Sequence, residues 1–301
     1  MGGVRLGIIA AGIGLTLPGA CWAHGSSPIG PGEIWSGWRP AFGMLLALLA
    51  VHLLYGYGVF ERWRQAGERR DILPRHMLAF AMGELALAIA LVSPLEAVAG
   101  TLFAAHMIQH VLLVAVAPPL LLAGKVDVAL FLLFKSAGWQ AGRNPVFRGL
   151  ATAWRYAETP MIATAVHGAV IWFWHAPFAF QAALNSPILH DLEHLTFFLS
   201  AMLFWRALFR SGRSARLAAF GALAAFITLL HSGFLGALIA FAQHPIYPGY
   251  VWTGLWDLSP LEDQQLAGLI MWVPAGLVYL VAGLVLAGRV LTPGKSAPLP
   301  Q

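Results

Sequence analysis

Apolar residues of this 301-residue chain gather in long runs that contain few charged positions. The hydrocarbon core of a bilayer is about 30 Å thick, so a spanning helix needs roughly 20 predominantly apolar residues. Such runs cover 41–60, 77–92, 102–123, 160–178, 188–208, 217–242 and 266–286. The pattern predicts an all-α membrane protein, a bundle of about seven transmembrane helices.

The first 23 residues are typical of a cleavable secretory signal. Arg5 precedes an apolar run, and the segment ends in Cys-Trp-Ala at Ala23. Cleavage there would make His24 the first residue of the mature protein. The two alternatives are an uncleaved signal anchor and a lipid-modified Cys21.

The remaining sequence leaves no room for a soluble domain. We expect the transmembrane domain to cover 24–292. The apolar segment 126–134 is too short to cross a bilayer and is expected to lie at the interface. The Pro-rich segment 293–301 is expected to form a disordered cytoplasmic tail.

Basic residues indicate the orientation of the predicted bundle. Loops 93–101, 179–187 and 243–265 contain no Lys or Arg. The loops at the other ends of the spans carry Arg62, Arg64, Arg69, Arg70, Arg75, Lys135, Arg143, Arg148, Arg155, Arg206, Arg210, Arg213, Arg216, Arg289 and Lys295. Cytoplasmic loops are enriched in Lys and Arg. The N-terminus of the mature chain is therefore expected outside the cell (inner) membrane and the C-terminus in the cytoplasm.

Composition supports the same class of protein. The chain is 59% hydrophobic and 10% charged, with a formal net charge of +5. Cytoplasmic loops account for this positive charge, so we expect the partner surface to be a lipid bilayer and not nucleic acid.

Histidines are the most informative polar residues, because ionisable groups within a membrane are expensive and commonly functional. His106 and His110 lie four residues apart at the outer start of the third span, and His190 and His194 repeat this spacing in the fifth. Residues four apart share one helix face. His175 lies near the outer end of the fourth span. We expect these five side chains to converge near the periplasmic side.

Two facing pairs of imidazoles could supply four nitrogen ligands to one metal ion. The predicted ligands are His106, His110, His190 and His194, with His175 and His231 as auxiliary ligands; His231 could also form a deeper layer with His52 and Glu84. Imidazole suits zinc, copper and iron. The nearby thioethers of Met107 and Met202 favour Cu(I), with zinc as the alternative. Hydrogen bonding between helices is the interpretation without a metal.

His190 to His194 also match the H-x-x-E-H pattern, in which two histidines bind zinc and the glutamate activates water. An intramembrane zinc hydrolase would use Glu193 as its general base and His106 or His110 as a third ligand. Glu193 could instead orient a ligand imidazole.

Four ordered motifs give the chain a resemblance to a known family. They are His106-Met-Ile-Gln-His110 running into Pro118-Pro119-Leu120; Trp174-His175-Ala-Pro177; His190 to His194 followed by Phe204-Trp205; and Asp263-Gln264-Gln265-Leu-Ala-Gly268 with Met271-Trp272. With these motifs the chain resembles the CtaG family of caa3-type cytochrome c oxidase assembly factors.

The resemblance implies a non-enzymatic role in maturing a haem-copper oxidase, with copper handled on the outer side of the membrane. Implied partners are cytochrome c oxidase subunits or other copper chaperones. A zinc hydrolase, a metal-free assembly scaffold and a copper permease remain the alternatives. Asp257, Glu262 and Asp263 lie at the expected outer rim, where they could attract a cation or be simply solvated.

Overall fold

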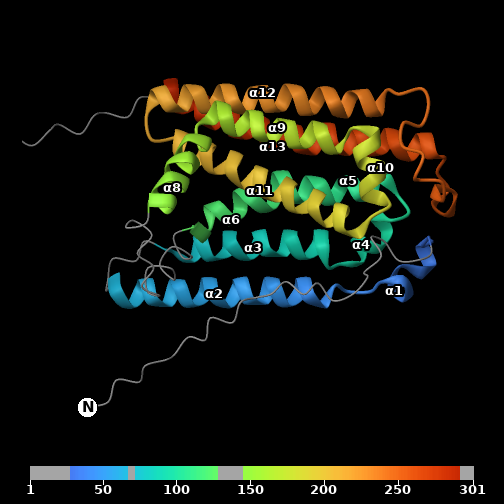
Figure 1. Cartoon of the computed structure of the whole chain (residues 1–301), viewed down its shortest axis with the longest axis horizontal. Coiled ribbons are helices and arrows are strands. Elements are labelled where there is room, and N and C mark those ends of the chain that lie inside the picture. The colour runs from blue at the N-terminus through green and yellow to red at the C-terminus, as the bar shows by residue number, and fades with distance from the viewer. Residues whose placement is uncertain (1–27, 67–71, 128–144, 292–301) are drawn as a thin grey trace, which may run out of the picture.

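The structure is a computed structural model that describes residues 28–66, 72–127 and 145–291 (Figure 1). The predicted signal segment 1–23, His24, the tail 293–301 and most of the predicted interfacial segment 126–134 lie outside these residues. Within them the regular elements are helices, with no strand, which confirms the all-α class.

Helix boundaries follow proline closely. Seven helices begin at a proline: α3, α4, α8, α9, α10, α11 and α13. N–H groups in the first helical turn have no partner within the helix, so a residue without an N–H is well suited to that position. The helices are α1 (Ile34–Gly37), α2 (Phe42–Ala66), α3 (Pro74–Leu91), α4 (Pro94–Ala99), α5 (Phe103–Val111), α6 (Ala117–Ala123), α8 (Pro145–Ala157), α9 (Pro160–Trp174), α10 (Pro177–Leu184), α11 (Pro187–Ser211), α12 (Ala215–Ala240) and α13 (Pro260–Leu291), with short turns η1 (Pro31–Glu33), η2 (Leu112–Val116) and η4 (Thr253–Trp256).

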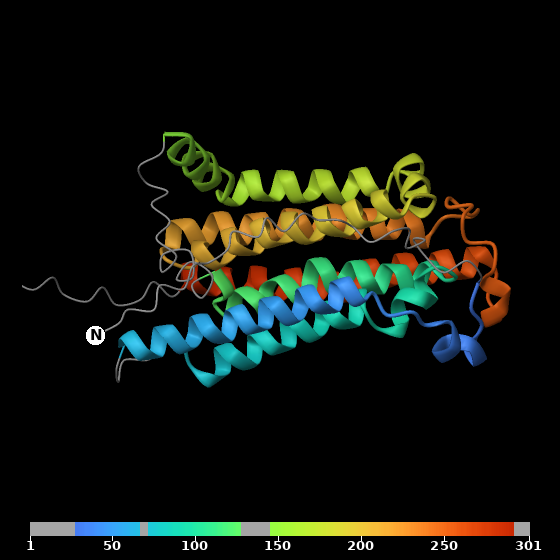
Figure 2. The ribbon, with the colours of Figure 1, turned by 60° about the horizontal axis from the view of Figure 1, so that its bottom comes forward.

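The long helices lie side by side along one axis, which gives the molecule two distinct ends (Figures 1 and 2). One end, here called the histidine end, holds α4, α10, η4 and the starts of α5 and α11. The other, the arginine end, holds Arg64, Arg155, Arg206, Arg210, Arg213, Arg216 and Arg289. Arg39, just before α2, is an exception at the histidine end.

Six helical segments in the described residues have the length and apolar character needed to cross a membrane. They are Phe42–Arg64, Pro74–Leu91, Phe103–Ala123, Pro187–Ser211, Ala215–Ala240 and Pro260–Leu291. The seventh expected span, 160–178, differs because α9 has only 15 residues, about 22 Å of helix. The helix ends because Pro177 starts α10 in a new direction.

The span Phe103–Ala123 is central and irregular. In an apolar 18-residue stretch of this span, 72% is buried inside the protein, compared with 17% in the corresponding stretch of Phe42–Arg64. Between α5 and α6 the turn η2 is π-helical, a local irregularity that is frequent at functional sites. The Trp205 indole donates to the backbone oxygen of Val114 at 2.8 Å. This bond satisfies a carbonyl within the irregular turn and ties it to α11.

Helices α12 and α13 pack with their backbones in close approach. A Cβ added to Gly268 would lie 2.4 Å from the backbone nitrogen of Ala240, and one on Gly236 would lie 3.0 Å from the oxygen of Gly268. Only glycine permits this contact, which is typical of helix pairs in membranes. The contact holds the first third of α13 against the end of α12, and α13 also packs on α5.

Candidate metal centre

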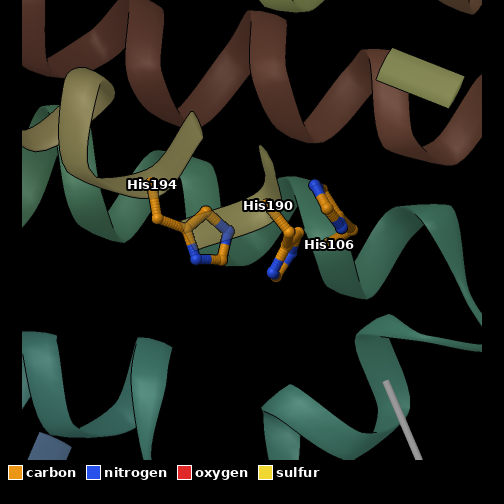
Figure 3. A group of neighbouring side chains, drawn as sticks. All are labelled: His106, His190 and His194. Carbon is orange, nitrogen blue, oxygen red and sulfur yellow. The ribbon is translucent and has the colours of Figure 1, made fainter. Parts of the chain in front are cut away.

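Helices α5 and α11 place four histidines in one buried group at the histidine end. His106 and His110 come from α5, and His190 and His194 come from α11. Figure 3 shows the rings of His106, His190 and His194 in the space between the two helices. One ligand atom from each of these three lies within 4.8 Å of the others. The two i, i+4 pairs therefore face each other across one interface.

Ring distances extend the group across three helices. The centroids of His106 and His110 lie 4.3 Å apart, and those of His190 and His194 lie 4.1 Å apart. Between the helices, His110 lies 5.6 Å from His194. His175, at the end of α9, lies 5.7 Å from His110. The structure thus brings together the five histidines whose convergence the sequence predicts.

Glu193 is the carboxylate at the centre of this group. Its Oε1 lies 3.7 Å from His110 Nε2, and its Oε2 lies 3.9 Å from His106 Nε2. The side chain is fully buried, and neither oxygen has a hydrogen-bond partner among the described residues. With His106 and His110 it forms a second set of closely spaced ligand atoms. The five histidines and Glu193 are called the histidine cluster below.

The hydrogen bond of His175 fixes its tautomer. Its Nδ1 lies 2.8 Å from the backbone oxygen of Ile171. Because a carbonyl only accepts, Nδ1 carries the proton and Nε2 keeps its lone pair. This Nε2 is buried without a hydrogen-bond partner among the described residues. Histidines that bind metals commonly have this arrangement, with one nitrogen donating to a backbone carbonyl and the other facing the ion.

Asp263 positions helix α5, contrary to the solvated role considered for it from the sequence. Its carboxylate accepts hydrogen bonds from the backbone nitrogens of Phe103 at 2.7 Å and Ala104 at 3.0 Å. These are the first two residues of α5, where N–H groups lack partners in the helix. Asp263 is fully buried. It therefore caps α5 from α13, a role that depends on a contact between distant segments.

Glutamines that follow Asp263 hold the preceding loop. Gln264 Oε1 accepts from the backbone nitrogen of Ile246 at 2.5 Å, and Gln265 donates to the oxygen of Ala242 at 3.2 Å. The Asp-Gln-Gln motif thus joins α5, α13 and the loop between α12 and α13.

Aromatic side chains cover the histidine cluster. Tyr247 donates its hydroxyl to the backbone oxygen of His175 at 2.8 Å. Tyr250 stacks on Phe103 at a centroid distance of 5.3 Å and lies 6.4 Å from His106. Phe180 of α10 lies 5.3 Å from His106. Burial raises the pKa of Tyr250 and, secondarily, so does the negative charge of Glu193. Tyr247 and Tyr250 could not be predicted as part of this cover, because the loop that carries them has no periodic pattern.

Glu96, in the short helix α4, borders the cluster from another side. Its carboxylate accepts a hydrogen bond from the Gln109 amide, which also donates to the backbone oxygen of Ala90 at 2.6 Å. Burial raises the pKa of Glu96 to about 7, and the neighbouring charge of Asp191 adds to the rise. Glu96 therefore titrates near neutral pH, beside the helix that carries His106 and His110.

The other polar residues predicted within the spans lie elsewhere. His231 of α12 packs against α9, where a Cβ on Gly168 would approach its Nε2 to 3.1 Å. His52 pairs with Glu84 through a 2.5 Å contact between α2 and α3. Figure 1 draws α2 and α12 at opposite edges of the bundle. The expected deeper layer is therefore found only in part: His52 meets Glu84, but His231 does not join them. Among the six predicted ligands, His231 also stands apart from the cluster.

The arrangement is suited to holding a cation. Several imidazole nitrogens and one carboxylate face each other in a buried space, and each can donate a lone pair. Isolated buried charges are costly unless a partner compensates them. A cation would bind the nitrogens and balance Glu193 at once. The residues thus fit a nitrogen-rich metal site.

Fold and site together define a helical membrane protein with a buried histidine–carboxylate cluster. The family model described as cytochrome c oxidase caa3 assembly factor (Caa3_CtaG) matches residues 53–292, which include the entire cluster. The chain belongs to this family of cytochrome c oxidase assembly factors, as its motifs indicated. No curated protein and no solved structure matches it.

Proposed function

We propose that this assembly factor binds Cu(I) in the histidine cluster and delivers it to a haem-copper cytochrome c oxidase. The observation that carries the proposal is the meeting of five histidines and Glu193 from three helices in one buried group. The role is one of binding and transfer, without catalysis. The copper is cargo.

Electrostatics supports a cationic ligand. Glu193 is buried without a hydrogen bond from any described residue, and a carboxylate in such surroundings is strongly destabilising when ionised. A bound cation removes that penalty. Interhelical hydrogen bonding alone, the interpretation without a metal, leaves both carboxylate oxygens unsatisfied.

Copper is favoured over zinc by the groups next to the cluster. Met107 follows His106 directly, is buried, and lines the same cavity as His110 and His175. Thioether sulfur selects Cu(I), whereas zinc prefers nitrogen, oxygen and thiolate ligands. Neutral imidazoles and thioethers also exchange more readily than a closed thiolate cage, which suits a protein that must release its metal.

The side of the membrane follows from the charge distribution. The histidine end bears the loops without Lys or Arg, and the arginine end bears most of the described arginines. By the positive-inside rule, this distribution supports a cluster that faces the periplasm. Copper would enter there and pass sideways to an oxidase subunit within the same membrane.

Cu(I) binding by purified protein tests this function. Competition with a chromophoric Cu(I) chelator under reducing, anaerobic conditions is expected to show at least one Cu(I) retained per wild-type chain. The double variant His106→Ala/His190→Ala should lose at least tenfold in affinity because it removes ligands from both helices. His244→Ala is the matched control, since His244 is an exposed histidine at the same end. If the wild-type protein binds no Cu(I), the proposal is wrong, and a metal-free assembly scaffold becomes the favoured function.

A zinc hydrolase is the second candidate, favoured by a specific arrangement. His106, His190 and His194 form a three-nitrogen group, and Glu193 lies 3.9 Å from His106, where it could act on a zinc-bound water. In this case zinc would bind more tightly than Cu(I) and Glu193 would be the general base. The variant Glu193→Gln separates the two candidates.

A further inference from the structure

A polar pocket lies at the arginine end, between the end of α6 and the last turns of α11. Its volume is about 300 Å³, and polar atoms make up most of its wall. Figure 1 shows these two helix ends at the same end of the bundle as α8. The residues of the wall are Leu122, Asp127, Arg206, Phe209, Arg210 and Arg213. None of them belongs to the histidine cluster.

The charges around this pocket do not cancel. Arg206 contacts both Asp127 and Glu158, and Arg210 contacts Glu158. Arg213 is exposed and has no ion pair with a described residue. Three guanidinium groups therefore stand against two carboxylates, which leaves one positive charge. An anion with a single negative charge would balance the pocket.

Glu158 holds two of the guanidinium groups in place. The exposed fraction of its side chain is only 2%. Its Oε1 accepts hydrogen bonds from the Trp154 indole at 2.6 Å and from Arg206 Nε at 2.5 Å, and its Oε2 accepts from Arg210. The bonds to acids use Nε and Nη1 of Arg206 but only Nη1 of Arg210. Since a guanidinium group has five N–H donors, donors of both arginines remain for a further acceptor.

Helix α8 indicates that the pocket lies at the level of the lipid headgroups. This helix runs at an angle to the long helices (Figures 1 and 2) and exposes Trp154 and Tyr156. Trp and Tyr are enriched at membrane–water interfaces. Because Trp154 donates to Glu158, α8 is joined directly to the arginines of the pocket. The exposed Phe209 adds an apolar edge to the pocket wall. A ligand here would meet guanidinium groups and an apolar surface together.

We infer that this pocket binds the phosphodiester headgroup of an anionic phospholipid, with Arg206, Arg210 and Arg213 as hydrogen-bond donors. Guanidinium groups match phosphate oxygens through paired hydrogen bonds, and basic pockets between transmembrane helices bind anionic headgroups. A phosphodiester carries one negative charge, which equals the charge left over in the pocket. Leu122 and Phe209 would contact the start of an acyl chain.

The bound lipid would hold the end of α11 against α6. Helix α11 also carries two histidines of the cluster, at its opposite end. The lipid site shares no residue with the cluster, so it does not depend on the binding of copper. It would make the stability of the bundle depend on the lipids around it.

Thermal unfolding of the purified protein in a neutral detergent tests the lipid site. Phosphatidylglycerol should raise the melting temperature, because a lipid bound only by the folded protein stabilises it. Phosphatidylcholine with the same acyl chains should give a much smaller rise, since its choline group cancels the charge of the phosphodiester. Inorganic phosphate at the same concentration should give no rise. A rise with phosphate equal to that with phosphatidylglycerol would overturn the lipid site and assign the pocket to a free anion.

Arg213→Gln is the test variant, because it removes a charge from the pocket without breaking an ion pair among the described residues. The phosphatidylglycerol concentration that gives half of the temperature rise should increase about fivefold, as expected for one arginine near a membrane surface. Arg216→Gln is the matched control, since Arg216 is exposed at the same end and does not line the pocket. It should respond like the wild-type protein. Equal responses of the wild-type protein and Arg213→Gln, or equal rises with the two lipids, would overturn the inference.

Discussion

At the scale of single residues, Glu193 sets the charge of the histidine cluster. A carboxylate with no hydrogen-bonding neighbour among the described residues is destabilising in a protein that lacks a bound cation. Its contacts of 3.7 and 3.9 Å to His110 and His106 are longer than hydrogen bonds, so an ion can fit among these groups. Glu193 would then lower the stability of the metal-free protein and raise that of the loaded protein.

Glu193→Gln is predicted to separate these two effects. The neutral amide should raise the melting temperature of the metal-free protein and reduce the further rise on adding Cu(I), since the charge that attracts the ion is gone. Thermal unfolding in detergent with and without Cu(I) measures both shifts. Asp257→Asn is the control, because Asp257 is exposed at the same end and asparagine tolerates its left-handed backbone conformation.

The same variant distinguishes transfer from hydrolysis. A zinc hydrolase would lose its activity without its general base, yet keep most of its zinc affinity. A Cu(I) carrier should retain partial copper binding through the imidazoles and support some oxidase assembly. If cells carrying Glu193→Gln have no active oxidase although the variant binds Cu(I) with wild-type affinity, the result would favour the zinc hydrolase.

At the scale of elements, the position of α5 depends on α13. Two backbone N–H groups at the start of α5 have their partners in Asp263, about 160 residues away in sequence. An anion at a helix N-terminus also interacts favourably with the helix dipole. The next residues, Gln264 and Gln265, hold the loop that covers the cluster. One short motif thus positions both the ligand helix and its cover.

Asp263→Ala is predicted to destabilise the protein by about 2 to 4 kcal/mol, because two buried N–H groups lose their acceptor. It should also weaken Cu(I) binding, since His106 lies one turn from the uncapped start of α5. Denaturation and chelator competition measure the two effects. Glu262→Ala removes the neighbouring carboxylate, which is exposed and bonds only to Ser259 in the described residues. If the two variants were equally stable and bound Cu(I) equally well, Asp263 would have no positioning role.

At the scale of the whole molecule, the two ends differ in the chemistry they present. Arg206 contacts both Asp127 and Glu158 at the arginine end, and Arg210 also contacts Glu158, so the buried Glu158 and the partly exposed Asp127 there are paired with arginine. At the histidine end the central acid, Glu193, is surrounded by imidazoles. The bundle therefore separates a structural charge network from a cluster suited to an exchangeable cation.

Labelling of single cysteines tests which end faces the periplasm. In a Cys21→Ser background, Gln243→Cys lies at the histidine end and Ala215→Cys at the arginine end, and both positions are exposed. A membrane-impermeant thiol reagent added to spheroplasts should label the first and leave the second unlabelled until the membrane is opened. The reverse result would put the cluster on the cytoplasmic side and contradict periplasmic loading.

The sequence by itself determined the membrane class, the approximate spans and the pairing of histidines, because hydropathy, loop charge and i, i+4 spacing are local properties of a helix. It could not say which faces of different helices meet. Only the tertiary structure showed that Asp263 caps α5, that Met271 and not Met202 joins Met107 at the cavity, and that His231 lies apart from the cluster. The rotation and depth of each helix are set by close packing between distant segments, such as Gly236 against Gly268. Because hydropathy is a property of each segment alone, it does not predict that packing.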